Sequence, residues 1–124
     1  MKDYVGKIIE ATTTVIAIDF DKVIHKNSKG YHDGTIYDDP VEGVKEALEV
    51  LSKKYTLVVF TCKAKPSRPF INGKGGRTLV WEWLRKHDLV QYISEVTHEK
   101  PWALYYIDDK AIKFTSWDQV LEEI

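Results

Sequence analysis

Three apolar segments that each run directly into polar residues constrain the fold of this chain more than any other feature. The segments are Thr14–Asp19, Tyr55–Thr61 and Ala103–Asp109, and their Val, Ile, Leu and Tyr side chains do not alternate regularly with polar ones. Such runs predict strands buried on both faces, as in a parallel sheet. Because helical patterns lie between them, we predict an α/β fold: a three-layer α/β/α sandwich with a mainly parallel, Rossmann-like sheet.

The helical patterns have recognisable ends. Asp39 is expected to cap the first helix, with Pro40 at its first position and Glu42 completing a capping box. Ser116 and Gln119 form the corresponding pair at the start of a closing helix. The apolar faces of the first helix and of a middle helix comprise Val41, Val44, Leu48 and Leu51, and Leu79, Val80, Trp83 and Leu84, respectively.

Shorter features complete the predicted order. A weaker strand at Ser94–Thr97 and a short one at Ile112–Phe114 are expected to join the sheet. Residues 22–38 are expected to form a small hairpin or flap, in which Val23–His25 pairs with Thr35–Tyr37 across the turn residues of the segment NSKG.

Composition excludes several classes of protein. The length of 124 residues fits one domain, over residues 1–124. The net charge of −1 gives no overall attraction to an anionic membrane, and nucleic acid is neither indicated nor excluded by it. Cys62 is the only cysteine, which rules out an internal disulfide framework. No signal peptide and no membrane span is predicted. We therefore expect a soluble, cytoplasmic protein, with homo-oligomer formation left open.

Polar side chains follow each of the three strong strands. Asp19 ends the first, Thr61 ends the second, and Asp108 and Asp109 end the third. Asp21 comes two positions after Asp19, so both should point to the same side. Ligands of parallel sheets bind outside the carboxyl ends of the strands, where these residues are predicted to converge. Carboxylates are costly to bury, so this edge is predicted to be a site that uses them.

These residue types suit the hydrolysis of a phosphate ester. A carboxylate can attack phosphorus and form an aspartyl-phosphate, which divides the reaction into two easier steps. A second carboxylate on the same side can protonate the departing alkoxide and later take a proton from water. Mg²⁺ held by Asp19 and by Asp108 or Asp109 would offset the negative charge. Thr61 and Lys100 are expected to bind the phosphate oxygens.

The segments TVIAIDFDKVIH, LVVFTC, EKP and YYIDD resemble, in this order, the four motifs of the haloacid dehalogenase (HAD) superfamily of phosphatases. The resemblance extends from Thr14 to Phe114, and the predicted hairpin resembles the squiggle and flap of the superfamily. It implies Asp19 as the nucleophile and Asp21 as the acid and base. The other implied catalytic residues are Thr61 and Lys100, which bind phosphate. The implied Mg²⁺ ligands are Asp19, the backbone carbonyl of Asp21, Asp108 and Asp109.

One position departs from the family pattern. Many members have Gly directly after the acid/base Asp, whereas this chain has Lys22, which leaves the conformation of the turn open. The spans from Asp21 to Thr61 and from Thr61 to Lys100 leave no room for a separate cap domain. A small, capless member is therefore expected, and its open site suits a large substrate or one covered by a loop or a neighbouring subunit.

The polar loop 63–77, here called the basic loop, carries cations and no acidic residue. Its cations are Lys63, Lys65, Arg68, Lys74 and Arg77. One interpretation is a solvated, mobile loop. The other is that the loop replaces the cap and favours substrates with negative charge beyond the reacting phosphate. Arg68 and Arg77 are then the main candidates, because a guanidinium can grip an anion in two places. Further predicted substrate contacts are Thr61, Cys62 and Lys63.

The remaining chemically active side chains are assigned to structure. Cys62 has no basic partner that marks it as a nucleophile and is expected to pack at the strand end. His25 and His32 are interpreted as surface histidines of the flap, and His87 and His98 lack metal-ligand spacing. The tryptophans expected in or near the core are Trp81, Trp83, Trp102 and Trp117.

Three other functions remain as alternatives. A receiver domain of a signalling relay uses similar residues, but its acidic pair comes early in the chain, whereas Asp108 and Asp109 come late. A catalytically silent binding module would not need Asp21. A phosphotransferase or mutase must keep water from the aspartyl-phosphate, which is difficult without a cap. The sequence thus favours a phosphatase whose substrate is a phosphorylated sugar, a nucleotide or the phosphate at a polymer end.

Overall fold

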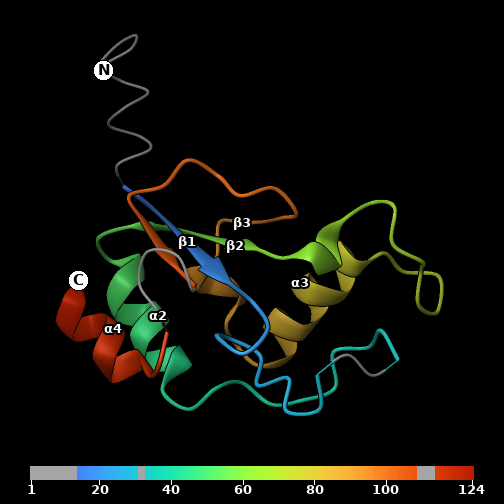
Figure 1. Cartoon of the computed structure of the whole chain (residues 1–124), viewed down its shortest axis with the longest axis horizontal. Coiled ribbons are helices and arrows are strands. Elements are labelled where there is room, and N and C mark those ends of the chain that lie inside the picture. The colour runs from blue at the N-terminus through green and yellow to red at the C-terminus, as the bar shows by residue number, and fades with distance from the viewer. Residues whose placement is uncertain (1–13, 31–32, 109–113) are drawn as a thin grey trace, which may run out of the picture.

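The computed structural model describes residues 14–30, 33–108 and 114–124, and a four-stranded sheet lies at its centre (Figure 1). The strands are β1 (Val15–Asp19), β2 (Thr56–Phe60), β3 (Glu95–Thr97) and β4 (Tyr105–Ile107). They are all parallel, and their order across the sheet is β3-β2-β1-β4. The predicted α/β class with a parallel sheet is therefore confirmed.

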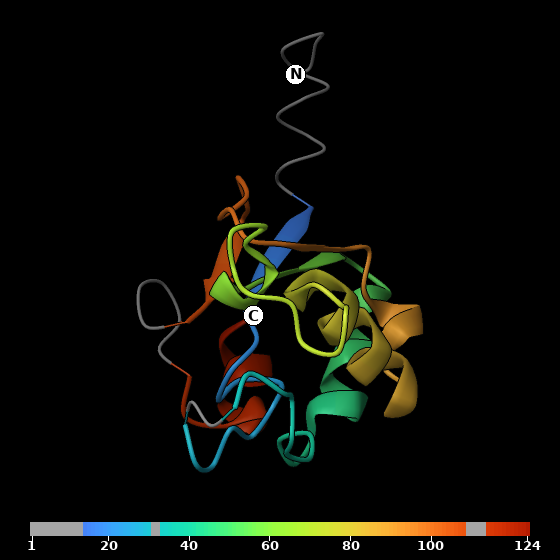
Figure 2. The same cartoon turned by 90° about the vertical axis from the view of Figure 1, so that its right-hand side faces the viewer.

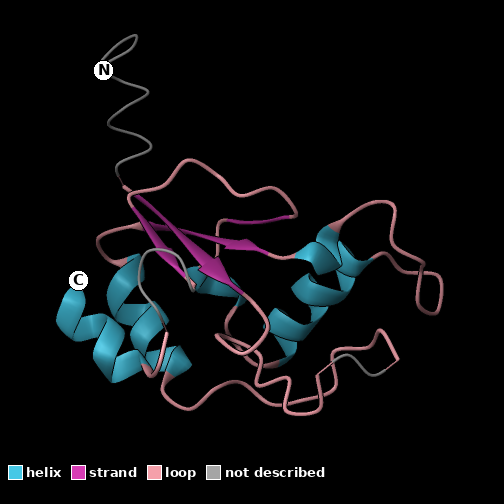
Figure 3. Ribbon diagram, viewed as in Figure 1, coloured by secondary structure: helices cyan, strands magenta, loops and turns pink. Residues whose placement is uncertain are grey.

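Three α-helices and two short 3₁₀ turns accompany the sheet in the described ranges (Figure 3). They are α2 (Val44–Ser52), η1 (Cys62–Ala64), α3 (Gly76–Lys86), η2 (Val90–Tyr92) and α4 (Trp117–Glu123). The three α-helices lie on the same side of the sheet, as Figure 1 and Figure 2 show. No helix in the described ranges is long and apolar enough to cross a membrane.

The core lies between the sheet and these helices. Ile16 and Ile18 of β1, together with their register partners Leu57 and Val59 of β2, are fully buried. They belong to one continuous cluster with the buried faces of α2, α3 and α4. Burying each such side chain contributes roughly 1.5–3 kcal/mol to folding. The cluster therefore fixes β1 in the middle of the sheet, and with it the position of Asp19 at the strand end.

The opposite face of the sheet differs from the prediction of a second helical layer. In the described residues it is crossed by the irregular segment 98–104, which connects β3 to β4 (Figure 1). A helical crossover needs about a dozen residues or more, and this segment is shorter. The Tyr106 hydroxyl holds it in place by donating to Pro101 O at 2.6 Å and accepting the Ala103 N–H at 3.2 Å. Trp102 is exposed here, although the sequence analysis placed it near the core.

Helix α2 begins later than predicted, whereas α4 begins where expected. The predicted capping box would start α2 at Pro40, but its first residue is Val44. The preceding Gly43 has a φ of 85°, a left-handed conformation that favours glycine, and no side chain caps the helix. At the start of α4, by contrast, the Ser116 hydroxyl accepts the Gln119 N–H at 3.1 Å.

The predicted flap is a loop whose two arms meet in a shifted register. His25 lies opposite Pro40, and the backbone hydrogen bonds on either side of this pair measure 2.8 and 2.9 Å. This contact replaces the predicted pairing of Val23–His25 with Thr35–Tyr37. Because Pro40 is held against the other arm, the chain enters α2 only after Gly43. The short strand predicted at 112–114 lies, apart from its last residue, outside the described residues.

Candidate active site

The carboxyl end of β1 places two acids on one pocket. Between them, Phe20 turns into the core, where its ring packs edge-on against Trp83 with centroids 5.2 Å apart. Asp19 and Asp21 both line an open pocket of about 310 Å³, here called the carboxylate pocket. Its other lining residues are Asn27, Thr61, Cys62, Lys63 and Arg68. The two predicted catalytic carboxylates, together with Thr61, therefore meet at one place.

A buried histidine orients Asp21. His25 is fully buried, and its Nδ1 lies 2.9 Å from Asp21 Oδ1. Its Nε2 accepts the Asp38 N–H at 3.1 Å. A ring nitrogen that accepts a hydrogen bond carries no proton, so the imidazole is neutral and donates its Nδ1 proton to Asp21. The interpretation of His25 as a surface histidine is therefore wrong.

Aromatic rings enclose His25. Phe20 stacks on it with ring centroids 5.4 Å apart, and Tyr37 and Trp83 contact it edge-on at 5.4 and 5.5 Å. These rings come from the end of β1, from the second arm of the loop and from α3. The position of the imidazole is thus set by three separate parts of the chain.

Asp38 completes the support of this histidine. Its carbonyl oxygen accepts the Trp83 Nε1–H at 3.0 Å, so the residue whose N–H contacts His25 is also held by α3. Its carboxylate accepts hydrogen bonds from the hydroxyl and the N–H of Ser28, at 2.5 and 2.9 Å. These bonds hold the pKa of the Asp38 carboxyl well below its ordinary value. The ionised carboxylate in turn ties the two arms of the loop together.

Thr61 and η1 bring a lysine to the second oxygen of Asp21. Thr61 follows β2 and is buried, and its Oγ1 accepts the Lys63 N–H at 3.2 Å, which caps η1. The Lys63 ammonium lies 3.3 Å from Asp21 Oδ2. The two oxygens of Asp21 therefore face different partners, a neutral imidazole at Oδ1 and a cation at Oδ2.

A glycine at the start of α3 sets the position of Lys63. A Cβ atom on Gly76 would lie 1.6 Å from the Lys63 carbonyl oxygen, so only glycine lets α3 approach η1 this closely. The neighbouring Gly75 differs, because it has a φ of −76° and its Cβ would meet only the Phe70 ring, at 3.7 Å or beyond. The helix start is consequently locked against the turn that presents Lys63.

The end of β4 adds a second carboxylate and lysine beside β1. Ile18 and Ile107 are register partners, so the residues that follow them, Asp19 and Asp108, end neighbouring strands side by side. The Lys100 ammonium lies 2.8 Å from Asp108 Oδ2. Neither Lys100 nor Asp108 is in the described lining of the carboxylate pocket, so the structure places this pair beside the end of β1 but not in the pocket wall.

Two aromatic rings hold Lys100 at this edge. Its ammonium lies over Phe60 of β2 and Tyr106 of β4, at 5.1 and 4.8 Å from the ring centroids. Such contacts contribute about 0.5–1 kcal/mol each where they are solvent-exposed. The segment 98–104, which starts at the edge strand β3, thereby places the Lys100 ammonium near the end of β1.

The described residues match the donor type of a magnesium site but do not form a complete cluster. Mg²⁺ prefers oxygen ligands and is usually held by one or two carboxylates together with water and substrate oxygens. Asp19 and Asp108 supply carboxylates on neighbouring strand ends. No group of three or more His, Cys, Asp or Glu side chains in the described ranges is arranged to hold a metal ion. Asp109, a further predicted ligand, lies outside the described residues.

Lys22 adopts a conformation that favours glycine. Its φ is 69°, in the left-handed region, which costs a non-glycine residue about 1–2 kcal/mol. Its N–H donates to His25 O at 2.7 Å, and its ammonium donates to Asn27 O at 3.2 Å. The turn after Asp21 therefore has the backbone shape that a glycine in this position would favour, and these hydrogen bonds hold the lysine in it.

Two cations of the basic loop are bound to acids outside the pocket. Arg77 donates from Nε to Val96 O at 2.9 Å and forms an ion pair with Glu95 of β3. The Arg77 guanidinium holds the pKa of the Glu95 carboxyl below its ordinary value. Lys74 pairs with Glu82 at 2.9 Å. The structure thus does not bring Arg77, a predicted substrate contact, to the carboxylate pocket.

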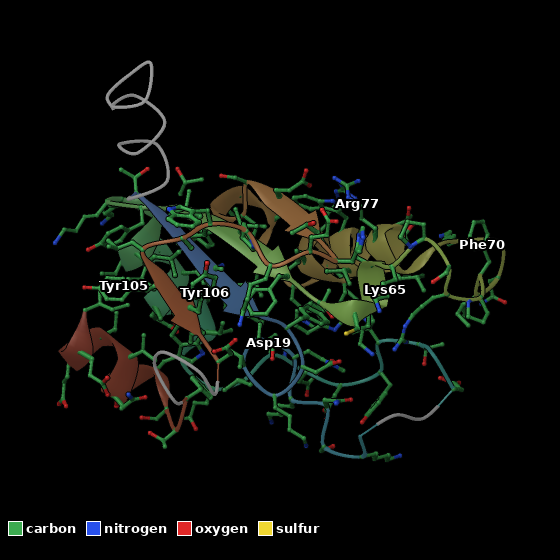
Figure 4. The ribbon with its side chains drawn as sticks, turned by 45° about the horizontal axis from the view of Figure 1, so that its top comes forward. Asp19, Lys65, Phe70, Arg77, Tyr105 and Tyr106 are labelled. Atoms are coloured by element: carbon green, nitrogen blue, oxygen red, sulfur yellow. The ribbon has the colours of Figure 1, made fainter. Side chains whose placement is uncertain are left out.

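Lys65 and Arg68 have no ion pair within the described part of the chain. Arg68 lines both the carboxylate pocket and a second hollow of about 230 Å³, whereas Lys65 lines that hollow but not the carboxylate pocket. Figure 4 shows Asp19 at the end of β1, with Lys65 to one side of it. Cys62 is exposed and lines the pocket, so its expected packing at the strand end is wrong.

Comparison of the chain with protein-family models, with curated proteins and with solved structures found no match. The case for a function therefore depends on the geometry of the carboxylate pocket.

Proposed function

We propose that this chain is a Mg²⁺-dependent phosphomonoester hydrolase, a small, capless, HAD-type enzyme that works through an aspartyl-phosphate. The observation that supports it most is the pairing of Asp19 with Asp21 on one pocket, with His25 bound to one oxygen of Asp21 and Lys63 near the other. A carboxylate held in this way keeps its orientation whether or not substrate is present. Such preorganisation suits a group that transfers a proton.

In the first step, a carboxylate oxygen of Asp19 attacks the phosphorus of the ester. A bond forms between this oxygen and phosphorus while the bond from phosphorus to the ester oxygen breaks. Asp21, in its protonated form, gives its proton to the departing alkoxide, which leaves as an alcohol. The Thr61 hydroxyl and the Lys100 ammonium stabilise the negative charge on the transferring phosphoryl group.

In the second step, water attacks the phosphorus of the aspartyl-phosphate. Asp21, now ionised, takes a proton from this water as the bond between phosphorus and the Asp19 oxygen breaks. Inorganic phosphate leaves, Asp19 returns to a carboxylate and Asp21 is again protonated. The same carboxyl group of Asp21 serves both steps, because the Nδ1–H of His25 holds Oδ1 throughout and leaves Oδ2 to carry the proton.

The proposed Mg²⁺ ligands are Asp19, the backbone carbonyl of Asp21, Asp108 and Asp109. When bound, the ion supplies the positive charge that lets an anionic nucleophile approach an anionic ester. Lys100 lies at Asp108 Oδ2 and brings further positive charge to the same edge. The left-handed turn at Lys22 agrees with the HAD pattern, in which many members have glycine at this position.

The substrate class follows from the openness of the pocket. A volume of about 310 Å³ without a cap suits a phosphorylated sugar, a nucleotide or an exposed phosphate of a larger molecule. Phosphate release is measured from a panel of these compounds in Mg²⁺, in Ca²⁺ and in chelator. Of these three conditions, only Mg²⁺ is expected to give activity. Ca²⁺ takes more ligands at longer distances, so it should not hold the reacting groups in the same geometry. Full activity in chelator contradicts the metal assignment.

The acid and base role of Asp21 has its own test. Asp21→Asn should slow alkyl phosphates by on the order of 10²-fold or more, but p-nitrophenyl phosphate less, because p-nitrophenolate leaves with little need of a proton. Asp88→Asn is the matched control, since Asp88 pairs with Lys45 away from the pocket. Equal losses on both substrates would mean that Asp21 is not the acid.

A further inference from the structure

The pocket has more room than one phosphoryl group requires, and one of the two cations in its lining has no ion pair among the described residues. Its volume of about 310 Å³ is roughly that of ten water molecules, whereas a phosphoryl group has only a few heavy atoms. Lys63 is paired with Asp21, so its charge already has a partner. The charge of Arg68 has no such partner among the described residues. Arg68 is therefore available to bind an anionic group of the substrate other than the reacting phosphate.

Arg68 is held at this place by its backbone. Its N–H donates to Lys65 O at 3.1 Å, which closes a turn with Pro66 at the second position, where proline fits best. Pro69 follows directly and further restricts the chain. The side chain of this pocket-lining residue thus starts from a stiff turn, and a backbone that is already ordered lowers the entropic cost of binding an anion there.

Arg68 also connects the pocket to its neighbours. Together with Lys63, it lines a second, smaller hollow that continues toward Gly34, Ile36 and Leu79. A substrate that extends out of the carboxylate pocket in this direction would pass the guanidinium. Arg77, the other arginine of the loop, is bound to Glu95 and Val96 instead.

We propose that Arg68 is a specificity-determining residue, which binds a second anionic group of the substrate beside the reacting phosphate. The preferred substrates are then phosphomonoesters that carry a carboxylate or a second phosphate on the same small molecule. Both groups present paired oxygens to the two N–H edges of a guanidinium. This inference rests on the proposed function, which supplies the reacting phosphate at Asp19.

Three substrates on one glycerol scaffold test the proposal: glycerol 3-phosphate, 3-phosphoglycerate and glycerol 1,3-bisphosphate. The first has no second anion, and the others carry a carboxylate or a phosphate. A charged hydrogen bond contributes about 1.5–3 kcal/mol, so kcat/KM should be roughly 10- to 100-fold higher for the compounds that carry a second anionic group. The larger of the two increases identifies the favoured anion. No preference for either anion overturns the proposal.

Arg68→Gln should remove this preference, because it should lower kcat/KM for 3-phosphoglycerate or glycerol 1,3-bisphosphate roughly 10- to 100-fold more than kcat/KM for glycerol 3-phosphate. Arg77→Gln and Lys65→Gln are matched controls. Arg77 is a paired arginine, and Lys65 is a cation outside the lining of the carboxylate pocket that has no ion pair within the described residues. Both should keep the preference. Raising the salt concentration should reduce the effect of Arg68→Gln, because salt screens exposed charges. Equal losses on all three substrates overturn the proposal.

Binding in chelator separates this inference from the proposed function. The same three compounds are titrated into the full chain without turnover, and the NMR signal of the Arg68 side-chain Nε–H is followed. A shift of this signal with 3-phosphoglycerate or glycerol 1,3-bisphosphate, but not with glycerol 3-phosphate, supports recognition by Arg68. This holds even if no compound is hydrolysed and the proposed function fails. Hydrolysis without any such shift overturns the role of Arg68 and leaves the proposed function standing.

Discussion

The two carboxylate and lysine pairs of the site are supported in opposite ways. At the end of β1, the Asp21 side chain is 30% exposed, but its partners are not: His25 is fully buried and Lys63 is 13% exposed. At the end of β4, the Asp108 side chain is only 10% exposed, whereas Lys100 is 32% exposed and belongs to a thin surface segment. At β1, the more exposed group is the acid, and its partners are buried or nearly so. At β4, the more exposed group is the cation Lys100, which contacts two aromatic rings and a nearly buried acid.

Under the proposed function, this difference corresponds to two separate tasks. A group that gives and takes a proton must keep one orientation through both steps, which the buried His25 and the locked η1 turn provide. A cation that neutralises a moving phosphoryl group can act from a flexible segment, as long as it stays near. Changes behind Asp21 should therefore harm turnover more than changes along the segment 98–104.

Removing His25 should give the largest effect. His25→Ala leaves Asp21 Oδ1 and the Asp38 N–H without their partner and opens a cavity among aromatic rings. The free energy of unfolding should fall by about 2–4 kcal/mol. At temperatures where the variant remains folded, kcat for alkyl phosphates should fall on the order of 10²-fold with little change in KM. Denaturant titration and steady-state kinetics measure the two effects.

Two further variants show whether His25 positions Asp21 or only fills space. His25→Asn keeps a side-chain N–H that can reach Asp21, so it should recover part of the lost kcat while remaining less stable than the natural chain. His87→Asn is the control, because His87 also packs on Trp83 but makes no contact with Asp21. Unchanged kcat in folded His25→Ala would show that the histidine is only structural.

Gly76→Ala should have the next largest effect, again on the β1 side. The new Cβ would collide with the Lys63 carbonyl oxygen, so α3 and η1 must move apart. We expect a loss of about 1–3 kcal/mol in stability and a several-fold loss of kcat as Lys63 leaves Asp21. Gly75→Ala is the matched control and should stay within about 0.5 kcal/mol of the natural chain. Equal behaviour of the two variants would contradict the locked position of Lys63.

The smallest effect is expected on the β4 side, from Tyr106→Phe. This change removes the hydroxyl that holds Pro101 and Ala103, so the segment that carries Lys100 loosens. Stability should fall by about 1 kcal/mol, and KM should rise a few-fold with kcat nearly unchanged. Tyr105→Phe is the control, because the Tyr105 ring packs against Tyr55 instead. If Tyr106→Phe lost more kcat than Gly76→Ala, the β4 side would matter more for turnover than the β1 side, which is the opposite of what we expect.

The parts of the fold that depend on continuous apolar runs could be predicted from the sequence. β1, β2 and β4 lie within the predicted segments, and Asp19 ends β1 as expected. The start of α2 could not, because the tertiary contact of Pro40 with His25 overrides a sound local capping signal. In the described residues, the sheet face opposite the helices carries a short connection, held by the Tyr106 hydroxyl, in place of the predicted helix.

The candidate site shows the same division. The convergence of Asp19, Asp21 and Thr61 follows from strand ends, but the role of His25 depends on Trp83 and Asp38, which are far away in the chain. The only local signal for its burial is the apolar pair that precedes it. The different fates of Arg68 and Arg77 likewise depend on which of them reaches the acids of β3. Such pairings are set by packing and are not visible in the pattern of one chain.

Chemical trapping at Asp19 tests the proposed function most directly. The chain is mixed with a phosphomonoester that it hydrolyses in Mg²⁺, quenched with acid, treated with borohydride and analysed by peptide mass spectrometry. Borohydride reduces an aspartyl-phosphate to homoserine, so homoserine is expected at position 19 and should be absent in chelator and in Asp19→Asn. Hydrolysis of the ester by the natural chain with no homoserine at position 19 would contradict the proposed mechanism. Full activity of the Asp19→Asn variant would contradict it as well.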